Sequence, residues 1–289
     1  MSDESALNTV LDGACRVLVT DAGVHAGRPI PADVLIDEAD PHAIDTLRVA
    51  LTVEEFPGAM CMCTGDVAFE FFDGHDRVLA VVGLHHGDAL RWSGWDGDAV
   101  LADGLAVLRW LDERGAARPL QQFAQDERRR EGTRRAASAW VEAMPRVLSE
   151  LAPQMLEISQ TGIASAELLD QVHSQLWTSM PEATGRTLAL LAWNGSGTGR
   201  CSGFPTHEEL PGQLLRTVPI GEIITSLQDP RADTRHDAGA VRHLVGWKSR
   251  DKQKQDIDAL PAQLRTRLLS QTLASGDADK QSRAQRWLG

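Results

Sequence analysis

The stretch that decides the fold of the first half of the chain is residues 60–92, which read MCMCTGDVAFEFFDGHDRVLAVVGLHHGDALRW. Two apolar runs, 60–72 and 77–85, flank the sequence Asp-Gly-His-Asp at 73–76, a composition typical of a tight turn. A second short turn, at 86–88, leads into a third apolar run. Because both connections are too short for a parallel crossover, this stretch predicts an antiparallel meander of strands.

The residues on either side of the meander extend the predicted sheet. Apolar and polar side chains alternate over residues 45–53, which predicts a further strand. Shorter apolar runs at 16–19 and 33–36 predict two more strands. Downstream, leucines at helical spacing over 105–111 predict an amphipathic helix that flanks the sheet and ends near Gly115.

Beyond Pro119 the apolar residues recur at the helical period, and no strand of five or more residues is expected there. This change predicts an α+β fold, with an antiparallel sheet domain over residues 1–116 and an all-α domain over residues 117–289. The helices predicted in the second domain span 119–131, 134–151, 166–179, 182–193, 208–216, 219–228, 234–248, 258–273 and 278–288.

Two segments near the C-terminus have similar sequences. In the first, an Asp-Pro turn and Asp233 precede a run of small and aliphatic residues, and a weaker copy follows around Asp279, 46 residues later. The pattern and its spacing resemble HEAT-like helical repeats, and this resemblance implies stacked helix pairs with a concave surface but no activity. The first segment should be helical and should bury four side chains against its neighbour: Ala238, Val241, Leu244 and Val245.

A second resemblance lies in the first half of the chain. The sequence Cys-Met-Cys at 61–63 is followed, one strand later, by His-His-Gly at 85–87. Together they resemble an uncharacterised bacterial domain in which a Cys-Met-Cys strand precedes a His-His-Gly turn, and the likeness covers residues 45–115. This resemblance implies no activity.

The side chains of Cys61, Cys63, His85 and His86 are the strongest chemical signal in the sequence. If the two strands pair directly across the turn at 73–76, Cys63 lies opposite His86, and a register slip of one residue puts His85 there instead. Alternation along a strand would place Cys61 on the same face as Cys63. We therefore expect two thiols and an imidazole to meet near the open end of the hairpin.

Three interpretations of this cluster are open. Thiolates and imidazoles are zinc ligands, so Cys61, Cys63, His85 and His86 are candidate metal ligands, although the usual Cys-x2-Cys spacing is absent. A thiol beside an imidazole can also be an activated nucleophile, which makes Cys61, Cys63 and His86 candidate catalytic residues. In the third interpretation, the cysteines are small core residues and the histidines make structural hydrogen bonds.

Composition restricts the partners. The chain has 289 residues, of which 42% are hydrophobic and 24% charged, as in an ordinary soluble globular protein. Its 41 acidic and 29 basic residues give a formal charge of −12, which argues against general binding to nucleic acid. The acidic start does not resemble a secretory signal, and no apolar stretch is long enough to span a bilayer. We therefore expect a cytoplasmic protein without a membrane partner, with reduced cysteines at 15, 61, 63 and 201.

Two functions of different classes follow from these observations. The first is an interaction module that binds a protein or peptide partner through the surface of its helical repeats, and the lack of a complete catalytic motif favours it. The second is a metal- or thiol-dependent enzyme that uses Cys61, Cys63 and His86 in a pocket between the domains. Zinc is the cofactor that such a set of side chains would take.

Overall fold

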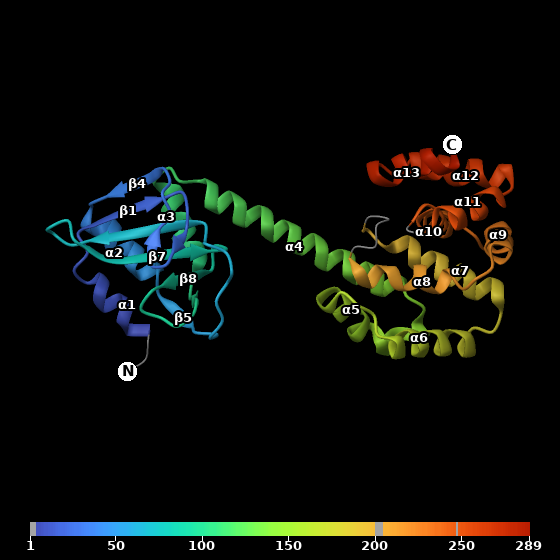
Figure 1. Cartoon of the computed structure of the whole chain (residues 1–289), viewed down its shortest axis with the longest axis horizontal. Helices are drawn as coiled ribbons and strands as arrows, with labels where there is room; N and C mark the ends of the chain where they lie inside the picture. The colour runs from blue at the N-terminus through green and yellow to red at the C-terminus, as the bar shows by residue number, and fades with distance from the viewer. Residues whose placement is uncertain (1–3, 200–204, 247) are drawn as a thin grey trace. The chain divides into compact units, whose positions relative to one another are not determined.

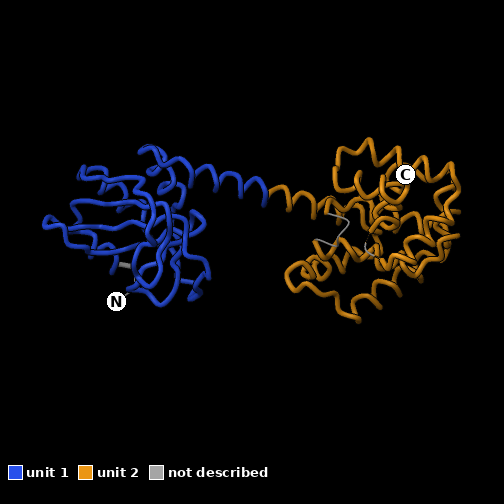
Figure 2. Tube along the Cα trace, turned by 45° about the horizontal axis from the view of Figure 1, so that its top comes forward, with its two compact units in different colours: residues 1–130 blue, residues 131–289 orange. Residues whose placement is uncertain are grey.

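The computed structural model describes three stretches of the chain, residues 4–199, 205–246 and 248–289. The chain divides into two compact units, unit 1 (residues 1–130) and unit 2 (residues 131–289), which Figure 2 colours separately. The division falls inside the long helix α4 (Arg118–Ala143), so this helix contributes residues to both units. Unit 1 is built on an antiparallel sheet and unit 2 is helical, which confirms the predicted α+β fold class (Figure 1).

Unit 1 contains a seven-stranded sheet with the strand order β4-β1-β6-β7-β8-β9-β5, and every neighbouring pair is antiparallel. A separate ribbon pairs β2 with β3. The strands are β1 (Arg16–Thr20), β2 (Val24–His25), β3 (Arg28–Pro29), β4 (Val34–Glu38), β5 (Val53–Glu55), β6 (Val67–Phe72), β7 (Val78–His85), β8 (Ala89–Trp92) and β9 (Ala99–Leu101). The helices before α4 are α1 (Glu4–Leu11), α2 (Pro41–Ala50) and α3 (Gly104–Glu113).

The predicted meander is present as β6, β7 and β8, but its register differs from direct pairing across the first turn by two residues. Phe72 pairs with Val78, so the turn contains one residue more than expected. A bulge between Phe71 and Phe72 adds the second residue, and Phe69 therefore pairs with Val82. Because the shift is even, the side chains expected to share a face still do so.

The strand predicted at 45–53 is wrong, because helix α2 occupies most of these residues and only β5 after it is extended. Asp40 caps the helix by accepting hydrogen bonds from backbone N–H groups of the first turn, and Pro41 occupies the first helical position. Apolar side chains therefore reach the core at helical spacing, which outweighs their alternation with polar ones. The buried residues of α2 are Ala43, Ile44, Leu47 and Ala50.

The core of unit 1 forms where the sheet packs against α1, α2 and α3. On β6 the alternate residues Val67, Phe69 and Phe71 are fully buried in this core. The indole N–H of Trp110, on α3, donates a 2.9 Å hydrogen bond to the carbonyl oxygen of Ala43, on α2, and ties the two helices together. The helix predicted downstream of the meander is thus confirmed as α3.

Unit 2 is helical throughout its described residues, as the spacing of apolar residues predicts. Two details differ: α4 is one continuous helix where two were expected, and α5 and α11 were not expected at all. After α4 come the 3-10 helix η1 (Arg146–Leu151), α5 (Ala152–Thr161), α6 (Ala166–Ser179), α7 (Ala183–Ser196), the 3-10 helix η2 (Thr206–Glu209), α8 (Leu210–Leu215), α9 (Ile220–Gln228), α10 (Thr234–Val245), α11 (Arg250–Asp258), α12 (Ala262–Leu273) and α13 (Ala278–Leu288).

Helices α7 and α10 pack very closely at the centre of unit 2. A Cβ atom added to Gly239 would lie 1.8 Å from the carbonyl oxygen of Leu191, so the contact requires glycine at this position. The side-chain amide of Asn194 donates a 2.8 Å hydrogen bond to the carbonyl oxygen of Gly239 and links the same two helices. The side chains expected to be buried in α10 are buried at Val241, Leu244 and Val245 and half-buried at Ala238.

Both helices of the predicted repeat begin at an aspartate cap. Asp233 accepts a hydrogen bond from the backbone N–H of Arg235, and its own N–H donates to the His236 ring, which completes a capping box. Helix α13 is capped by Asp277 and not by Asp279. Since aspartate caps occur in helices of every fold, they do not test the likeness to HEAT repeats, which stays a prediction.

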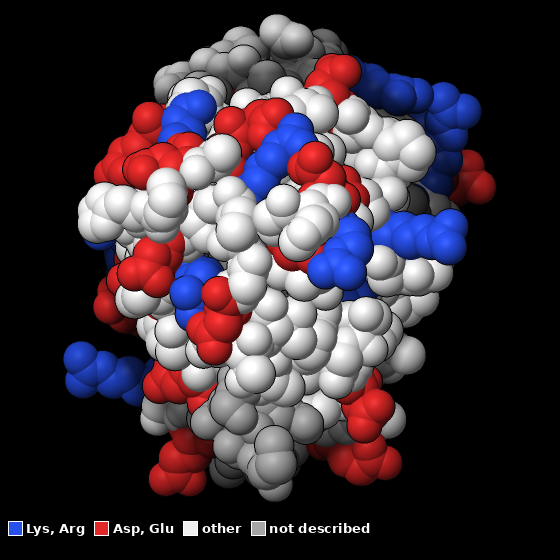
Figure 3. Space-filling model, turned by 90° about the vertical axis from the view of Figure 1, so that its left-hand side faces the viewer, with Lys and Arg blue, Asp and Glu red and all other residues white. Residues whose placement is uncertain are grey.

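Charged side chains of both signs are mixed on the surface. Figure 3 shows acidic and basic side chains interspersed over the face of unit 1 that lies at the left of Figure 1. On α4, Arg129, Arg130, Arg134 and Arg135 each pair with an acidic residue one turn away. Among the described residues, no helix combines the length and the apolar character that crossing a membrane requires.

Candidate metal centre

The candidate site lies where the β7–β8 turn meets the irregular loop that precedes β6. His85 ends β7, and the turn closes with a hydrogen bond from the Asp88 N–H to the His85 carbonyl oxygen. His86 and Gly87 both have positive φ, of 55° and 79°, as the central residues of a type I′ turn do. Positive φ is uncommon for a residue such as His86, and strain of this kind is often found at functional sites.

The two cysteines reach the site from a loop, and not from a strand as the alternating pattern predicts. β6 begins only at Val67, so Cys61 and Cys63 lie in irregular backbone. The guanidinium of Arg91 holds this backbone by donating to the carbonyl oxygens of Cys61 (2.5 Å) and Cys63 (2.9 Å). Asp98 accepts a 2.7 Å hydrogen bond from the Cys61 N–H and forms a two-point ion pair with Arg91.

The two sulfur atoms and two imidazole nitrogens converge. The Cys61 and Cys63 sulfurs are 2.9 Å apart, and both cysteines are recorded as free thiols. Nδ1 of His85 lies 3.1 Å from the Cys63 sulfur. Nε2 of His86 lies 3.3 Å from the Cys61 sulfur and 3.4 Å from the Cys63 sulfur. The four residues expected to meet therefore do meet, although two of them come from a loop.

Burial differs within the cluster and gives the four groups different proton affinities. His85 is fully buried, and both thiols are half-buried. Hydrogen bonds with Cys63 and His86 lower the pKa of the Cys61 thiol to about 7. The hydrogen bond between Cys61 and His86 also raises the pKa of His86. Burial raises the pKa of the Cys63 thiol and lowers the pKa of His85, because it disfavours the charged form of each.

The ligand set and its spacing fit a tetrahedral metal ion. Zinc bonds of about 2.3 Å to sulfur and 2.0–2.1 Å to nitrogen imply ligand atoms roughly 3.3–3.8 Å apart in a tetrahedral site. Four of the six distances between the candidate ligand atoms are 2.9–3.4 Å, so these atoms have to move apart slightly to admit an ion. Ligand atoms of Cys61, Cys63 and His85 all lie within 4.8 Å of one another. His86 is outside this mutual group but contacts both sulfurs through Nε2, so its ring has to move toward His85 if it is to be the fourth ligand.

A cavity of about 380 Å³ borders the cluster within unit 1. Cys63 forms part of its wall, and two tryptophans that meet edge to face, Trp92 and Trp95, form another part. Met60 and Met62 also line it, and both side chains are exposed. The thiol side of the cluster is therefore open to a molecule of modest size.

Sequence reasoning missed Arg91 and Asp98, which hold the cysteine loop in place. Arg91 belongs to the predicted third run of the meander, but its contacts with the loop depend on a fold of residues 56–66 that no local pattern indicates. Of the other cysteines, Cys15 is exposed and has no part in the cluster, and Cys201 lies outside the described residues. Comparisons with protein-family models, with curated proteins and with solved structures find no match for this chain.

Proposed function

We propose that unit 1 binds one zinc ion through Cys61, Cys63, His85 and His86. The observation that carries this proposal is the convergence of two sulfurs and two imidazole nitrogens at 2.9–3.4 Å from their nearest partners. Sulfur and imidazole nitrogen are the ligands that zinc takes in structural sites, and four protein ligands complete its tetrahedral coordination.

The contacts around the four ligands support the proposal. Metal ligands are usually oriented by a second set of hydrogen bonds, and the Arg91–Asp98 pair supplies such bonds to the backbone of Cys61 and Cys63. Both members of this pair are largely buried, with side chains 17% and 9% exposed. A rigid, desolvated ion pair is well suited to hold a loop at a fixed distance from the β7–β8 turn.

The ion would link the cysteine loop to the β7–β8 turn, two segments that β6 and β7 separate along the chain. The loop at 56–66 forms no strand and is joined to neighbouring strands by single backbone hydrogen bonds, from the Val24 N–H to the Thr64 carbonyl oxygen and from the Asp66 N–H to the Leu84 carbonyl oxygen. The turn at 85–88 holds strained backbone at His86. A bond to metal on each side would offset that strain and fix the loop against the sheet. The role of zinc in this proposal is therefore to stabilise unit 1.

A second candidate function is catalysis at the same cluster, and the cavity beside Cys63 favours it. Because that cavity is lined by aromatic and thioether side chains, it would take an apolar molecule of modest size. In this case His86 would give way to water or to a bound molecule, and Cys61, Cys63 and His85 would remain as ligands.

The interaction role of the helical unit stays a prediction. A protein or peptide partner was expected to bind the concave surface of stacked helix pairs. The contacts of the described residues in unit 2 do not test whether such a surface binds a partner.

The direct test is metal analysis of the purified full chain with matched variants. Elemental analysis should give about one zinc per chain for the wild type and for Cys15→Ser, which removes an exposed thiol away from the cluster. Cys63→Ser and His85→Gln should lose the ion. Cobalt substitution should add the thiolate-to-cobalt absorption and the strong visible bands of tetrahedral coordination. In Cys61→Ser the thiolate-to-cobalt absorption should be weaker.

Other results would contradict the proposal in distinguishable ways. Wild-type protein that stays metal-free after zinc reconstitution, with both thiols modified rapidly in the native state, would indicate a thiol nucleophile. Metal-free protein whose thiols react only in denaturant would indicate a packed core. Bound zinc that survives His86→Ala and acquires a water ligand would favour the catalytic candidate over the stabilising one.

A further inference from the structure

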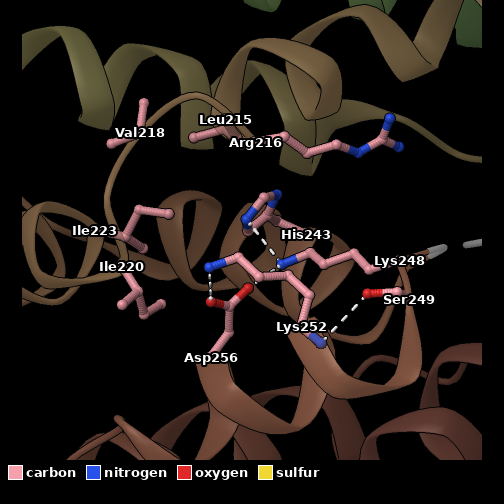
Figure 4. Close-up of a pocket in the computed structure, with 10 residues that line it drawn as sticks. All are labelled: Leu215, Arg216, Val218, Ile220, Ile223, His243, Lys248, Ser249, Lys252 and Asp256. Carbon is pink, nitrogen blue, oxygen red and sulfur yellow. Dashed lines mark hydrogen bonds and ion pairs between the residues drawn. The ribbon is translucent and has the colours of Figure 1, made fainter.

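Unit 2 contains a cavity of about 330 Å³ that is independent of the cysteine cluster. It lies among α8, α9, α10 and α11, and Figure 4 shows the side chains that line it. This volume is near the lower end of the range for small-molecule pockets, so the cavity suits a compact organic molecule.

One side of the cavity is apolar. Leu215 and Ile223 are fully buried, Val218 is 8% exposed and Ile220 is half-buried. In Figure 4, Val218, Ile220 and Ile223 lie at the left of the view, and Arg216 and Lys248 lie at the right. A hydrocarbon group placed against them would be removed from water at no cost in unpaired polar atoms.

The other side carries charged groups, and Lys248 is central among them. Its side chain is only 6% exposed, and its ammonium group contacts His243 Nε2 at 3.0 Å and Asp256 at 2.8 Å. Burial and the Lys248 charge lower the pKa of His243 to about 3, so the imidazole is neutral and accepts this hydrogen bond. An ammonium has three N–H donors, and these contacts account for two of the three.

Lys252 and Arg216 add further positive charge. The Lys252 ammonium lies 3.0 Å from Asp256, which leaves it donors to spare, and its side chain is 52% exposed. Arg216 pairs with Glu209 at 3.0 Å, outside the cavity wall. Three cations therefore face two carboxylates, and one net positive charge remains at this side of the cavity.

We propose that the cavity binds a small organic carboxylate, with the carboxylate on Lys248 and Lys252 and its apolar body against Leu215, Val218 and Ile223. A carboxylate monoanion matches the one excess positive charge and accepts the donors that the two lysines have left. A buried ammonium with an unused donor is costly, and this ligand would satisfy it.

Other ligand classes fit less well. An organic cation would meet the excess positive charge, and a neutral hydrocarbon would leave the lysine donors without an acceptor. A phosphate dianion carries more negative charge than the site offsets, and side-chain donors, rather than a cradle of backbone N–H groups, line the cavity. The apolar wall and the lysine pair together favour a carboxylate that carries a short alkyl chain or a ring.

Calorimetric titration of the full chain with three probes of equal length tests this inference. Octanoate should bind, and 1-octanol should bind at least about tenfold more weakly, since a charge-assisted hydrogen bond is worth about tenfold in affinity. Octylamine should not bind measurably. Lys252→Met should weaken octanoate binding about tenfold and leave octanol unchanged. Lys254→Met is the matched control, because Lys254 is exposed on the same helix and does not line the cavity.

A second variant keeps the inference testable if charge removal disturbs the fold. Ile220→Trp fills the apolar side from a half-buried position, and it should abolish octanoate binding while the helical circular dichroism and its thermal transition are retained. Octanoate that binds no more tightly than octanol overturns the inference. So does equal loss of affinity in Lys252→Met and Lys254→Met, or unchanged octanoate binding in a folded Ile220→Trp variant.

Discussion

The two units differ in the partners that their buried polar groups have. In unit 2 the buried charges have partners of opposite sign: Arg242 with Glu208 at 2.7 Å, and Lys248 with Asp256 at 2.8 Å. In unit 1 the cluster at the β7–β8 turn brings together two thiols and two imidazoles, and no carboxylate or cation balances them within the four-residue set.

This difference indicates which cluster needs an external component. The Arg242–Glu208 pair balances its own charge, although a buried ion pair contributes little net stability compared with apolar residues of the same shape. The two sulfurs lie 2.9 Å apart, and each also contacts an imidazole nitrogen, the Cys61 sulfur at His86 Nε2 and the Cys63 sulfur at His85 Nδ1 and His86 Nε2. A metal cation would give the sulfurs and nitrogens a common partner.

Breaking the Arg242–Glu208 pair should produce the largest effect. The two side chains are 4% and 1% exposed, and Glu208 also accepts hydrogen bonds from the backbone N–H groups of Thr198 and Gly199. Glu208→Gln should lower the free energy of unfolding of unit 2 by about 3–5 kcal/mol, because the Arg242 charge stays buried without a counter-ion. Urea unfolding followed by helical circular dichroism measures it.

The matched control for that variant is Glu131→Gln. Glu131 is 50% exposed and pairs with Arg134 one turn away on α4. Because water screens such a pair, its loss should change the free energy of unfolding by less than about 0.5 kcal/mol. Similar losses in the two variants would show that burial does not distinguish the two pairs.

Metal removal should give the second largest effect and should be confined to unit 1. With free zinc at about 100 times its dissociation constant, bound metal adds about 2.7 kcal/mol to the stability of the folded state. A chelator should therefore lower the thermal transition reported by the near-ultraviolet circular dichroism of Trp92 and Trp95, whose rings are 5.4 Å apart. The transition of the helices in unit 2 should stay in place.

Variants of the cysteines complete this test. Cys63→Ser should show the lower transition with or without chelator, and Cys15→Ser should respond to chelator as the wild type does. A chelator shift of equal size in Cys63→Ser would mean that the stabilising metal binds elsewhere.

Sequence patterns predicted secondary structure and contacts within a hairpin, but they did not predict contacts between segments that are distant in the sequence. The β6–β7 hairpin followed from its turn residues and apolar runs, and so the approach of Cys63 to His86 could be anticipated, although Cys63 lies in the loop before β6. The cap at Asp40 was the local signal that identifies α2 as a helix, and alternation concealed it. Arg91 and the cavity at Lys248 could not be predicted, because each depends on how separate elements pack in three dimensions.

Loss of the Arg91–Asp98 ion pair, which holds the cysteine loop, should have a smaller effect on zinc binding at the cluster. Asp98→Asn keeps the shape of the side chain but removes the charge that holds Arg91, so the carbonyl contacts of the cysteine loop should loosen. Zinc affinity should fall about 10-fold to 100-fold, as it does when groups that hydrogen-bond to metal-binding residues are lost. Competition with a chromophoric chelator measures this, and Asp96→Asn, at an exposed position in the same loop, should bind zinc as the wild type does.

The smallest effect should be a pH dependence of unit 2 that comes from His243. Its pKa falls from the usual 6.5 to about 3, chiefly because of burial, and Lys248, Arg216 and Lys252 oppose its protonation while Asp256 favours it. The unfolded chain therefore binds more protons than the folded chain below about pH 6.5, and stability falls as the pH is lowered. Between about pH 6 and pH 5 this group alone should cost about 1 kcal/mol.

Comparison of two histidine variants isolates this contribution. Burial also lowers the pKa of His207, which acts in the same direction, so His243→Gln should reduce the slope of unfolding free energy against pH without removing it. His207→Gln should likewise reduce the slope without removing it, because burial lowers the pKa of both rings. Urea unfolding at a series of pH values gives both slopes. Equal slopes in wild type and His243→Gln would mean that His243 has the same pKa in the folded and unfolded protein, which contradicts its burial against the Lys248 ammonium.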